Sequence, residues 1–375
     1  MKIGILTHYY QSRNYGGLLQ AYALCEVIKD MGIDVEQISY DRFSQKKKMK
    51  SYVRLYLKKI RDIICYPQEL IIHKKIKQRA EALESFEKSI PHSRVYSDEN
   101  LNQSVDLYDG FIVGSDQVWH PNVLCKGYLL SFVPGTKLKL SYAASVAKDE
   151  LTEEQRQVLK SALQDYTAVS VREEQAVSLL KAVSPVEIEW VLDPTLLLSR
   201  QKWSLLCPKC EINEPYLFCY FLGDEKHPRD LAREYAAAHN LKVVNLPHLM
   251  GHYRKCDVCF ADIEKYDVSP GQLLSLINNA SCIFTDSFHA MIFAGIFQRQ
   301  YFVFNRGEFG NMSSRIYSLG KLYKAEERFC DTSEKQQMAY LDSIQAIDYS
   351  IELSMLEHMK KKSLNFLESN LNLRK

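Results

Sequence analysis

The stretch SCIFTDSFHAMIFAGI, residues 281–296, contains the strand-to-helix junction that decides the fold. Residues 282–284 form a short apolar run typical of a buried strand, and residues 290–296 indicate an apolar helix. Four polar residues lie between them: Thr285, Asp286, Ser287 and His289. Ligands of open α/β sheets bind outside the carboxyl ends of the strands, where helix N-termini present free N–H groups. We therefore expect a functional site at this junction, where His289 donates to an anion or acts as a general acid.

A structural interpretation of the same residues is that Asp286 or Ser287 only caps the following helix, while His289 packs beneath a loop. A cap needs one such residue, whereas the junction holds four polar groups within five positions. The density of polar groups favours the functional interpretation.

The composition is that of a globular enzyme. A chain of 375 residues predicts two to three domains, and 46% hydrophobic with 25% charged residues excludes global disorder. The formal net charge of +2 gives no reason to expect nucleic acid as a partner. Met1 and Lys2 lead directly into an apolar run without a signal peptide, so we expect a cytoplasmic protein with reduced thiols.

Two CxxC pairs raise the question of zinc. Cys207 and Cys210 form one pair, and Cys256 and Cys259 form the other. Four thiolates from two such pairs could hold a structural zinc ion, but the separation between the pairs is longer than in zinc ribbons. Scattered reduced thiols are the favoured interpretation, and we predict neither a metal site nor a cofactor.

Strands and helices alternate along most of the chain, which is typical of parallel α/β sheets. The first half has apolar strand patterns at residues 2–7, 35–40, 110–113, 139–143, 168–171 and 188–192. The second half has them at residues 216–222, 242–246, 282–284 and 300–304. We predict an N-terminal Rossmann-like domain over 1–200, a C-terminal one over 214–345, and a terminal helix over 350–373.

The alternation stops at about residues 44–90, where we predict a basic helical insertion. Residues 46–61 combine lysines and arginines with tyrosines and aliphatic residues in the pattern of a basic amphipathic helix, and a second helix follows at 73–88. Such a helix can lie on an anionic membrane, cover the protein as a solvated face, or form a lid over an anionic donor.

Small or charged residues follow several predicted strands. The loop after the first strand is long and polar and ends in Gly16 and Gly17, which would let a ligand approach the backbone at a helix N-terminus. This loop does not contain GxGxxG, so a dinucleotide site is not indicated.

Asp116 and Arg172 follow two later strands, which is the arrangement of a site at a carboxyl edge. Asp116 could instead be a helix N-cap.

Several segments together resemble the polysaccharide pyruvyl transferase family. They are MKIGILTHYYQSRNYGGLLQAYAL at the start, FIVGSDQVWHP (111–121), LSYAASVA (140–147), AVSVREE (168–174), VLDPTLLL (191–198), VSPGQLLSLINNASCIFTDSFHAMIFAGIF (268–297) and NMSSRI (311–316). The resemblance implies two Rossmann-like domains in an arrangement like that of GT-B glycosyltransferases, with a cleft between them. It also implies transfer of the carboxyethylidene group of phosphoenolpyruvate onto two hydroxyls of a sugar, which forms a cyclic ketal.

The resemblance suggests roles for individual residues. His289 matches the family's histidine and is the expected general acid, while Arg172 matches an arginine that would clamp the anionic donor. Many family members have arginine two residues before the histidine, where this chain has Ser287; Arg315 or Arg306 could supply that cation. The other residues that we assign to the donor are Asp286, Ser287, Gly16 and Gly17.

For the acceptor sugar, we expect Asp116 to deprotonate a hydroxyl. The residues that we expect to bind this sugar are Asn14, Tyr15, Gln117 and Trp119. If a polyprenyl diphosphate carries the sugar, the segment 46–61 would dock the enzyme on the inner face of the plasma membrane. Two alternatives are a GT-B nucleotide-sugar glycosyltransferase and a non-catalytic member of a polysaccharide-assembly complex.

Overall fold

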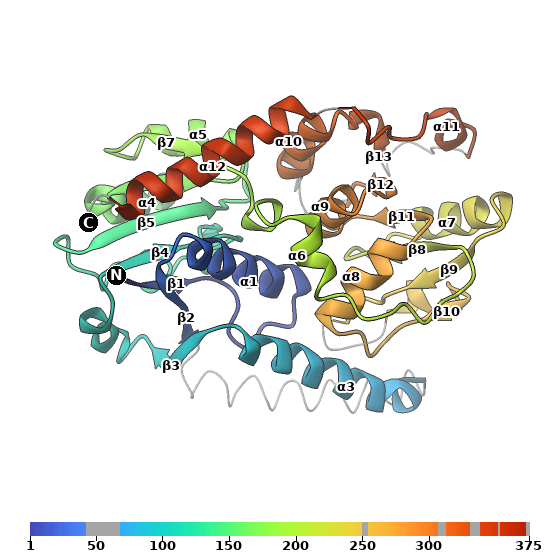
Figure 1. Ribbon diagram of the computed structural model, residues 1–375, viewed down its shortest axis with the longest axis horizontal. Helices are drawn as coiled ribbons and strands as arrows, with labels where there is room; N and C mark the ends of the chain where they lie inside the picture. Colours follow the sequence, from blue (N-terminus) through green and yellow to red (C-terminus); the bar gives the residue numbers. More distant parts are fainter. Residues whose placement is uncertain (43–67, 250–253, 307–312, 331–337, 352, 373–375) are drawn as a thin grey trace.

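A computed structural model describes residues 1–42, 68–249, 254–306, 313–330, 338–351 and 353–372. These residues form two α/β domains, each built on a parallel sheet (Figure 1). The predicted fold class, two Rossmann-like domains in a GT-B-like arrangement, is confirmed. The basic segment 46–61 lies outside the described residues.

The first domain contains a seven-stranded sheet of order β3-β2-β1-β4-β5-β6-β7. Its strands, all parallel, are β1 (Lys2–Leu6), β2 (Asp34–Asp41), β3 (His92–Ser97), β4 (Gly110–Val113), β5 (Leu138–Ala144), β6 (Ala168–Val171) and β7 (Ile188–Trp190). Its main helices are α1 (Tyr15–Asp30), α3 (Gln68–Ser89), α4 (Glu153–Ala162) and α5 (Glu174–Lys181).

Helices cover both faces of this sheet, which explains why its central strands are apolar along their whole length. On β4, Ile112 belongs to the core that includes α1, whereas Phe111 and Val113 belong to the core that includes α4 and α5. The alternation of strand side chains thus fills two cores from one short apolar run.

The second domain contains a six-stranded sheet of order β10-β9-β8-β11-β12-β13. Its parallel strands are β8 (Tyr216–Tyr220), β9 (Lys242–Asn245), β10 (Ile263–Glu264), β11 (Cys282–Thr285), β12 (Gln300–Phe304) and β13 (Phe329–Cys330). Its helices are α7 (His227–Ala238), α8 (Pro270–Asn279), α9 (Phe288–Ile296), α10 (Ser313–Tyr323) and α11 (Met338–Ser343).

Three edge strands, β3, β10 and β13, are absent from the sequence prediction. The strand β3 has the mixed sequence HSRVYS, and β10 and β13 contain two residues each. Two-residue strands exist because a neighbouring strand offers hydrogen bonds, as β12 does for β13. Neither such short strands nor the mixed sequence of β3 has a periodicity that reveals them.

Two segments join the domains. The helix α6 (Arg200–Ser204) buries Trp203 against Phe293 of the second domain, with ring centroids 4.9 Å apart, and against Tyr22 of the first at 5.7 Å. The helix α12 (Ser354–Asn372) returns from the second domain and lies across the first (Figure 1). There, the Leu192 N–H donates to Ser363 Oγ at 2.9 Å.

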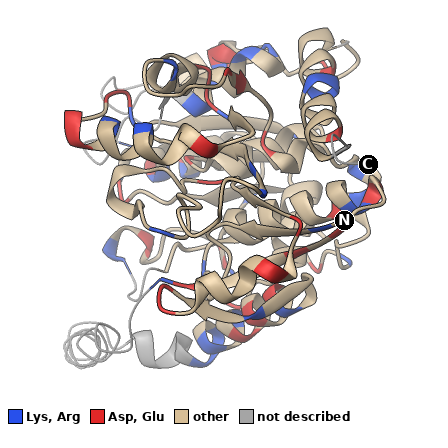
Figure 2. Cartoon of the chain, turned by 90° about the vertical axis from the view of Figure 1, so that its left-hand side faces the viewer, with Lys and Arg blue, Asp and Glu red and all other residues tan. Residues whose placement is uncertain are grey.

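Basic and acidic residues are interspersed over the described helices on the side of the molecule shown in Figure 2. This mixture agrees with the formal net charge of +2. None of the helices in the described part of the chain combines the length and apolar character needed to cross a membrane.

Candidate active site

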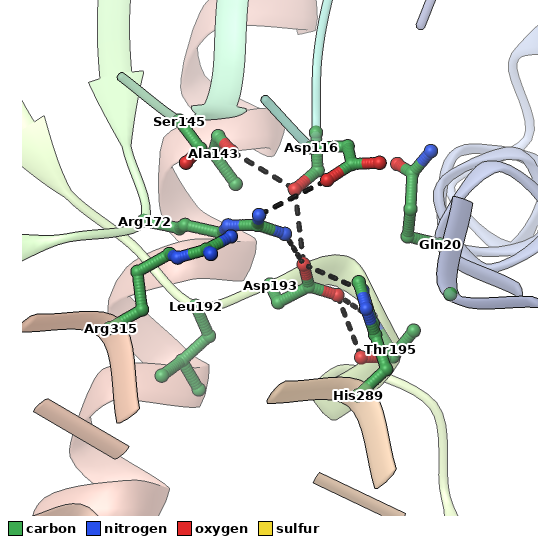
Figure 3. Close-up of polar contacts among 12 residues, drawn as sticks. Gln20, Asp116, Ala143, Ser145, Arg172, Leu192, Asp193, Thr195, His289 and Arg315 are labelled. Carbon is green, nitrogen blue, oxygen red and sulfur yellow. Dashed lines mark hydrogen bonds and ion pairs between the residues drawn. The ribbon is translucent and has the colours of Figure 1, made fainter. Parts of the chain in front are cut away.

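The carboxyl edge of the first sheet meets the N-terminus of α9 from the second domain (Figure 3). Asp116 follows β4, Arg172 follows β6, Asp193 follows β7, and His289 lies in the first turn of α9. This boundary is where the sequence predicts an interdomain cleft, and charged side chains from both domains meet across it.

Arg172 is at the centre of this charged cluster, and its side chain is fully buried. One terminal nitrogen contacts Asp193 Oδ2 at 2.8 Å and the other contacts Asp116 Oδ1 at 3.2 Å, while the guanidinium lies over the Phe288 ring. Burial of an arginine requires such partners. The two carboxylates therefore occupy the nitrogens that a donor clamp would use, and this geometry favours a positioning role for Arg172.

Asp193 is the site residue that our sequence analysis does not assign. Its carboxylate accepts hydrogen bonds from the Thr195 hydroxyl at 2.7 Å and the Ser115 hydroxyl at 3.1 Å, besides the Arg172 contact. Burial alone would raise the pKa of Asp193, but the nearby His289 and Arg172 hold it well below its usual value. Asp193 is therefore ionised. Its sequence signal, an Asp-Pro pair at a strand end, also fits a simple cap.

His289 faces Asp193 across the domain boundary. Its Nε2 lies 3.7 Å from Asp193 Oδ2, which is an ion-pair distance but too long for a hydrogen bond. This nitrogen is buried and has no hydrogen-bond partner among the described residues. The Asp193 carboxylate can orient the ring and offset the charge of its protonated form, which is the relation expected around a general acid.

Asp116 is held in a strained backbone conformation. Its φ of 68° lies in the left-handed region, and its carbonyl accepts the Ser145 N–H at 2.9 Å. Burial would raise the pKa of Asp116, but the Arg172 charge lowers it overall. An ionised carboxylate fixed at a sheet edge fits the predicted base role.

Arg315 joins the cluster from α10. Its Nε lies 3.8 Å from Glu173 Oε1, and the amide oxygen of Gln117, turned toward it, accepts from both terminal nitrogens at 3.1 Å. Burial, with the neighbouring Arg172, lowers the pKa of Arg315 to about 10, so the guanidinium remains charged at neutral pH. The structure thus brings the predicted donor residue Arg315 and the predicted acceptor residue Gln117 together.

Asp286 and Ser287 have local structural partners. The Asp286 carboxylate accepts the Leu222 and Gly223 N–H groups, both at 2.7 Å, and its backbone carbonyl accepts from Arg306 at 2.9 Å. Ser287 caps α9 by accepting the Ala290 N–H at 3.4 Å. These two residues fix the position of the helix that carries His289.

The side chains of the remaining predicted acceptor residues have structural partners outside the charged cluster. Asn14 caps α1 by accepting the Gly16 N–H at 3.0 Å. Tyr15 and Trp119 are buried core residues: the Tyr15 hydroxyl donates to the Val268 carbonyl at 2.6 Å, and the Trp119 indole donates to the Tyr128 carbonyl at 3.1 Å. Their side chains stabilise the domains rather than line a surface.

Gly16 permits the close contact between α1 and His289. A Cβ atom at this position would lie 2.1 Å from His289 Nδ1, so the approach that this glycine allows is to the imidazole. A Cβ atom on Gly17 would lie 2.8 Å from the His8 carbonyl oxygen and 3.6 Å from Asp116 Oδ2. Gly16 is therefore needed for the two domains to meet at this point, whereas Gly17 permits a close approach within the first domain.

We expect Gly16→Ala to lower the free energy of unfolding by about 1–3 kcal/mol, because the new methyl group overlaps a rigid ring. Urea denaturation measures this loss. Gly135→Ala is the control, since its Cβ would lie 3.5 Å from the nearest atom. In the His289→Ala background, Gly16→Ala should cost much less free energy of unfolding than it does in the wild-type protein. If the cost is the same in both backgrounds, the overlap with the ring is not the cause.

Several buried side-chain atoms near the boundary have no hydrogen-bond partner within the described structure, among them Arg172 Nε, Glu173 Oε2, His289 Nε2 and Arg306 Nε. Buried polar atoms are nearly always satisfied, so a group of unsatisfied ones indicates a place for a polar ligand or water. Among all the residues that the structure describes, no group of three or more His, Cys, Asp or Glu side chains could hold a metal ion.

The chain was compared with solved structures, and the similarities extend over nearly its whole length. The UDP-GlcNAc 2-epimerase from Neisseria meningitidis bound to UDP-GlcNAc is 12% identical, with a TM-score of 0.56 over 99% of this chain and 100% of that one. The S. aureus MnaA–UDP structure is 11% identical, with a TM-score of 0.56 over 99% and 97%. At such identities, the similarity concerns the GT-B fold alone.

A comparison with curated proteins gave no match. The family model for polysaccharide pyruvyl transferases, in contrast, matches residues 14–308. This range includes the strands from β2 to β12 and the residues Asp116, Arg172, Asp193 and His289. The chain belongs to the polysaccharide pyruvyl transferase family.

Proposed function

We propose that this protein transfers the carboxyethylidene group of phosphoenolpyruvate onto two hydroxyls of a sugar during the biosynthesis of a cell-surface polysaccharide. The observation that carries the proposal is the contact between His289 and Asp193 across the domain boundary, beside the buried Arg172. A proton donor, an ionised carboxylate and arginines then lie at one point, which transfer from an anionic enol ester requires.

The chemistry needs four proton transfers at the reacting atoms. The enol methylene of phosphoenolpyruvate gains a proton as one sugar hydroxyl adds to the neighbouring carbon and loses its own proton. The phosphate then leaves and takes a proton, and the second hydroxyl closes the ketal and loses one. We assign the first donation to His289 and the first removal to Asp116, the fixed carboxylate of the cluster.

Arg315 and Arg306 are the cations that we propose for the donor. Arg315 is charged and buried at the boundary, and Arg306 contacts the residue that precedes the Ser287 cap. Each can donate charge-assisted hydrogen bonds to a phosphate or a carboxylate, and the N-terminus of α9 adds N–H groups. The proposal requires no cofactor besides phosphoenolpyruvate as co-substrate.

The acceptor sugar would be held beside Asp116 and Gln117. A free glycan, a nucleotide sugar and a polyprenyl-diphosphate-linked sugar are the acceptor classes to compare. We propose that the enzyme works in the cytoplasm. For a lipid-linked acceptor, segment 46–61 would provide peripheral contact with an anionic membrane.

Phosphate release from phosphoenolpyruvate tests the proposal across a panel of glycosyl acceptors. We expect release only with the correct acceptor, in equal amount to a product that carries a new methyl signal in its NMR spectrum. Nucleotide sugars serve as competing donors. Cleavage of a nucleotide sugar without consumption of phosphoenolpyruvate would instead identify a glycosyltransferase, and turnover of neither donor would indicate a non-catalytic role.

A further inference from the structure

Glu173 is a buried acidic residue to which the assignments above give no task. It occupies the N-cap position of α5, where a Ser, Thr, Asp or Asn side chain would accept a backbone N–H of the helix, but it makes no such bond. Its side chain is instead 3% exposed and lies at the domain boundary. The chain thus gives up a helix cap to place a carboxyl group inside the charged cluster.

The groups around Glu173 come from three elements. The Ser145 hydroxyl, after β5, donates to Oε1; Arg172 Nε, after β6, lies 3.7 Å from that oxygen, and Arg315 Nε, from α10, lies 3.8 Å from it. The second oxygen, Oε2, is buried without a hydrogen-bond partner among the described residues. An acceptor in that position is costly when ionised, whereas a protonated carboxyl could donate from it to a ligand.

Glu173 and the two aspartates have different electrostatic environments. Burial raises the pKa of Glu173 above its usual value despite the nearby Arg172 and Arg315. The terminal nitrogens of Arg172 contact Asp116 and Asp193 instead, and both of these carboxyls have lowered pKa values. Neighbouring carboxyls whose pKa values are moved in opposite directions are suited to opposite proton-transfer roles.

We propose that Glu173 handles the protons of the second half of the reaction, which rests on the function proposed above. In that half, the bond between the central carbon and the phosphate oxygen breaks, its electron pair stays on the phosphate, and the phosphate takes the Glu173 proton. The second sugar hydroxyl then bonds to the same carbon and returns its proton to the Glu173 carboxylate. Glu173 ends each cycle protonated, and the phosphate leaves from beside Arg315, one of the two cations proposed for the donor.

Deuterium exchange separates the two halves of the reaction. Addition of the first hydroxyl gives a phosphorylated adduct whose former methylene is a methyl group, and reversal of this step in D2O places deuterium in phosphoenolpyruvate. For Glu173→Gln, we expect ketal formation to fall about 100-fold, the scale for one acid–base residue, while acceptor-dependent exchange stays near the wild-type rate. Glutamine keeps the size and hydrogen bonding but cannot transfer the proton.

Glu174→Gln is the matched control, because Glu174 is the exposed next residue on α5, and we expect it to change neither rate. If Glu173→Gln fails to fold, Ser145→Ala, which removes only the hydroxyl bonded to Glu173, is the second variant: it should slow ketal formation and leave exchange near the wild-type rate. Loss of exchange and ketal formation in equal measure would overturn the proposal, as would no loss of either. A wild-type enzyme that never consumes phosphoenolpyruvate would refute the proposed function itself.

Discussion

His289→Gln should form ketal on the order of 100-fold more slowly than the wild-type enzyme, which is the usual contribution of one general acid. Glutamine can donate a hydrogen bond toward Asp193 but cannot release a proton to carbon. Because His289 is assigned to the methylene proton, deuterium exchange into phosphoenolpyruvate should fall together with ketal formation. This joint loss distinguishes the variant from Glu173→Gln, in which only ketal formation should fall.

The measurements are phosphate release and NMR-detected exchange, with thermal unfolding as a check that the variant folds. His358→Gln is the control, since His358 is an exposed histidine on α12. Turnover close to the wild-type rate in His289→Gln would remove the general-acid assignment. The contact with Asp193 would then serve only to hold the domains together.

Arg172→Ala should lower the free energy of unfolding at neutral pH by about 3–5 kcal/mol, the typical result of breaking a buried ion pair. The variant leaves the Asp116 and Asp193 carboxylates close together inside the protein without their shared counter-ion. Urea denaturation measures the loss, and Arg200→Ala is the control because Arg200 is exposed at the start of α6.

The pH dependence identifies the cause of this loss. In the wild-type protein, the pKa values of both aspartates lie below the ordinary 3.8, so their contribution to stability is present above pH 3.8 and is lost as the pH falls through the lowered values. Without Arg172, burial raises these pKa values, and protonation should relieve the strain. The variant should therefore gain more stability than the wild-type protein when the pH falls from 7 to 5. A constant difference between the two proteins would contradict this explanation.

The sequence predicted the local parts of the molecule. The junction at residues 281–296 forms β11 and α9, and Ser287 caps the helix, because apolar periodicity and capping depend on residues close in the chain. The ion pair between Arg172 and Asp193 was not predictable, since it forms because β6 and β7 are neighbours in the sheet. In the sequence, an arginine that binds a donor anion looks the same as an arginine that positions two carboxylates.

The same limit explains the acceptor residues and Glu173. Tyr15 and Trp119 are adjacent to polar loops in the sequence. The burial of Tyr15 depends on Val268 in the other domain, and that of Trp119 depends on the turn that contains Tyr128. Glu173 resembled an ordinary acidic residue at a helix start. That its carboxyl group contacts Ser145 and Arg315 instead of capping the helix is known only from the three-dimensional structure.

The attachment of α12 to the first domain affects the timing of assembly during protein synthesis. Ser363 accepts the N–H of Leu192, the residue directly before Asp193, and Phe366 packs on Tyr142 of β5. The ribosome makes these partners long after the strands that they contact. The nascent first domain therefore emerges with part of its sheet uncovered and the segment that carries Asp193 not yet tethered. Until α12 has been synthesised, the growing chain can complete neither that surface nor the hydrogen bond that holds the backbone next to Asp193.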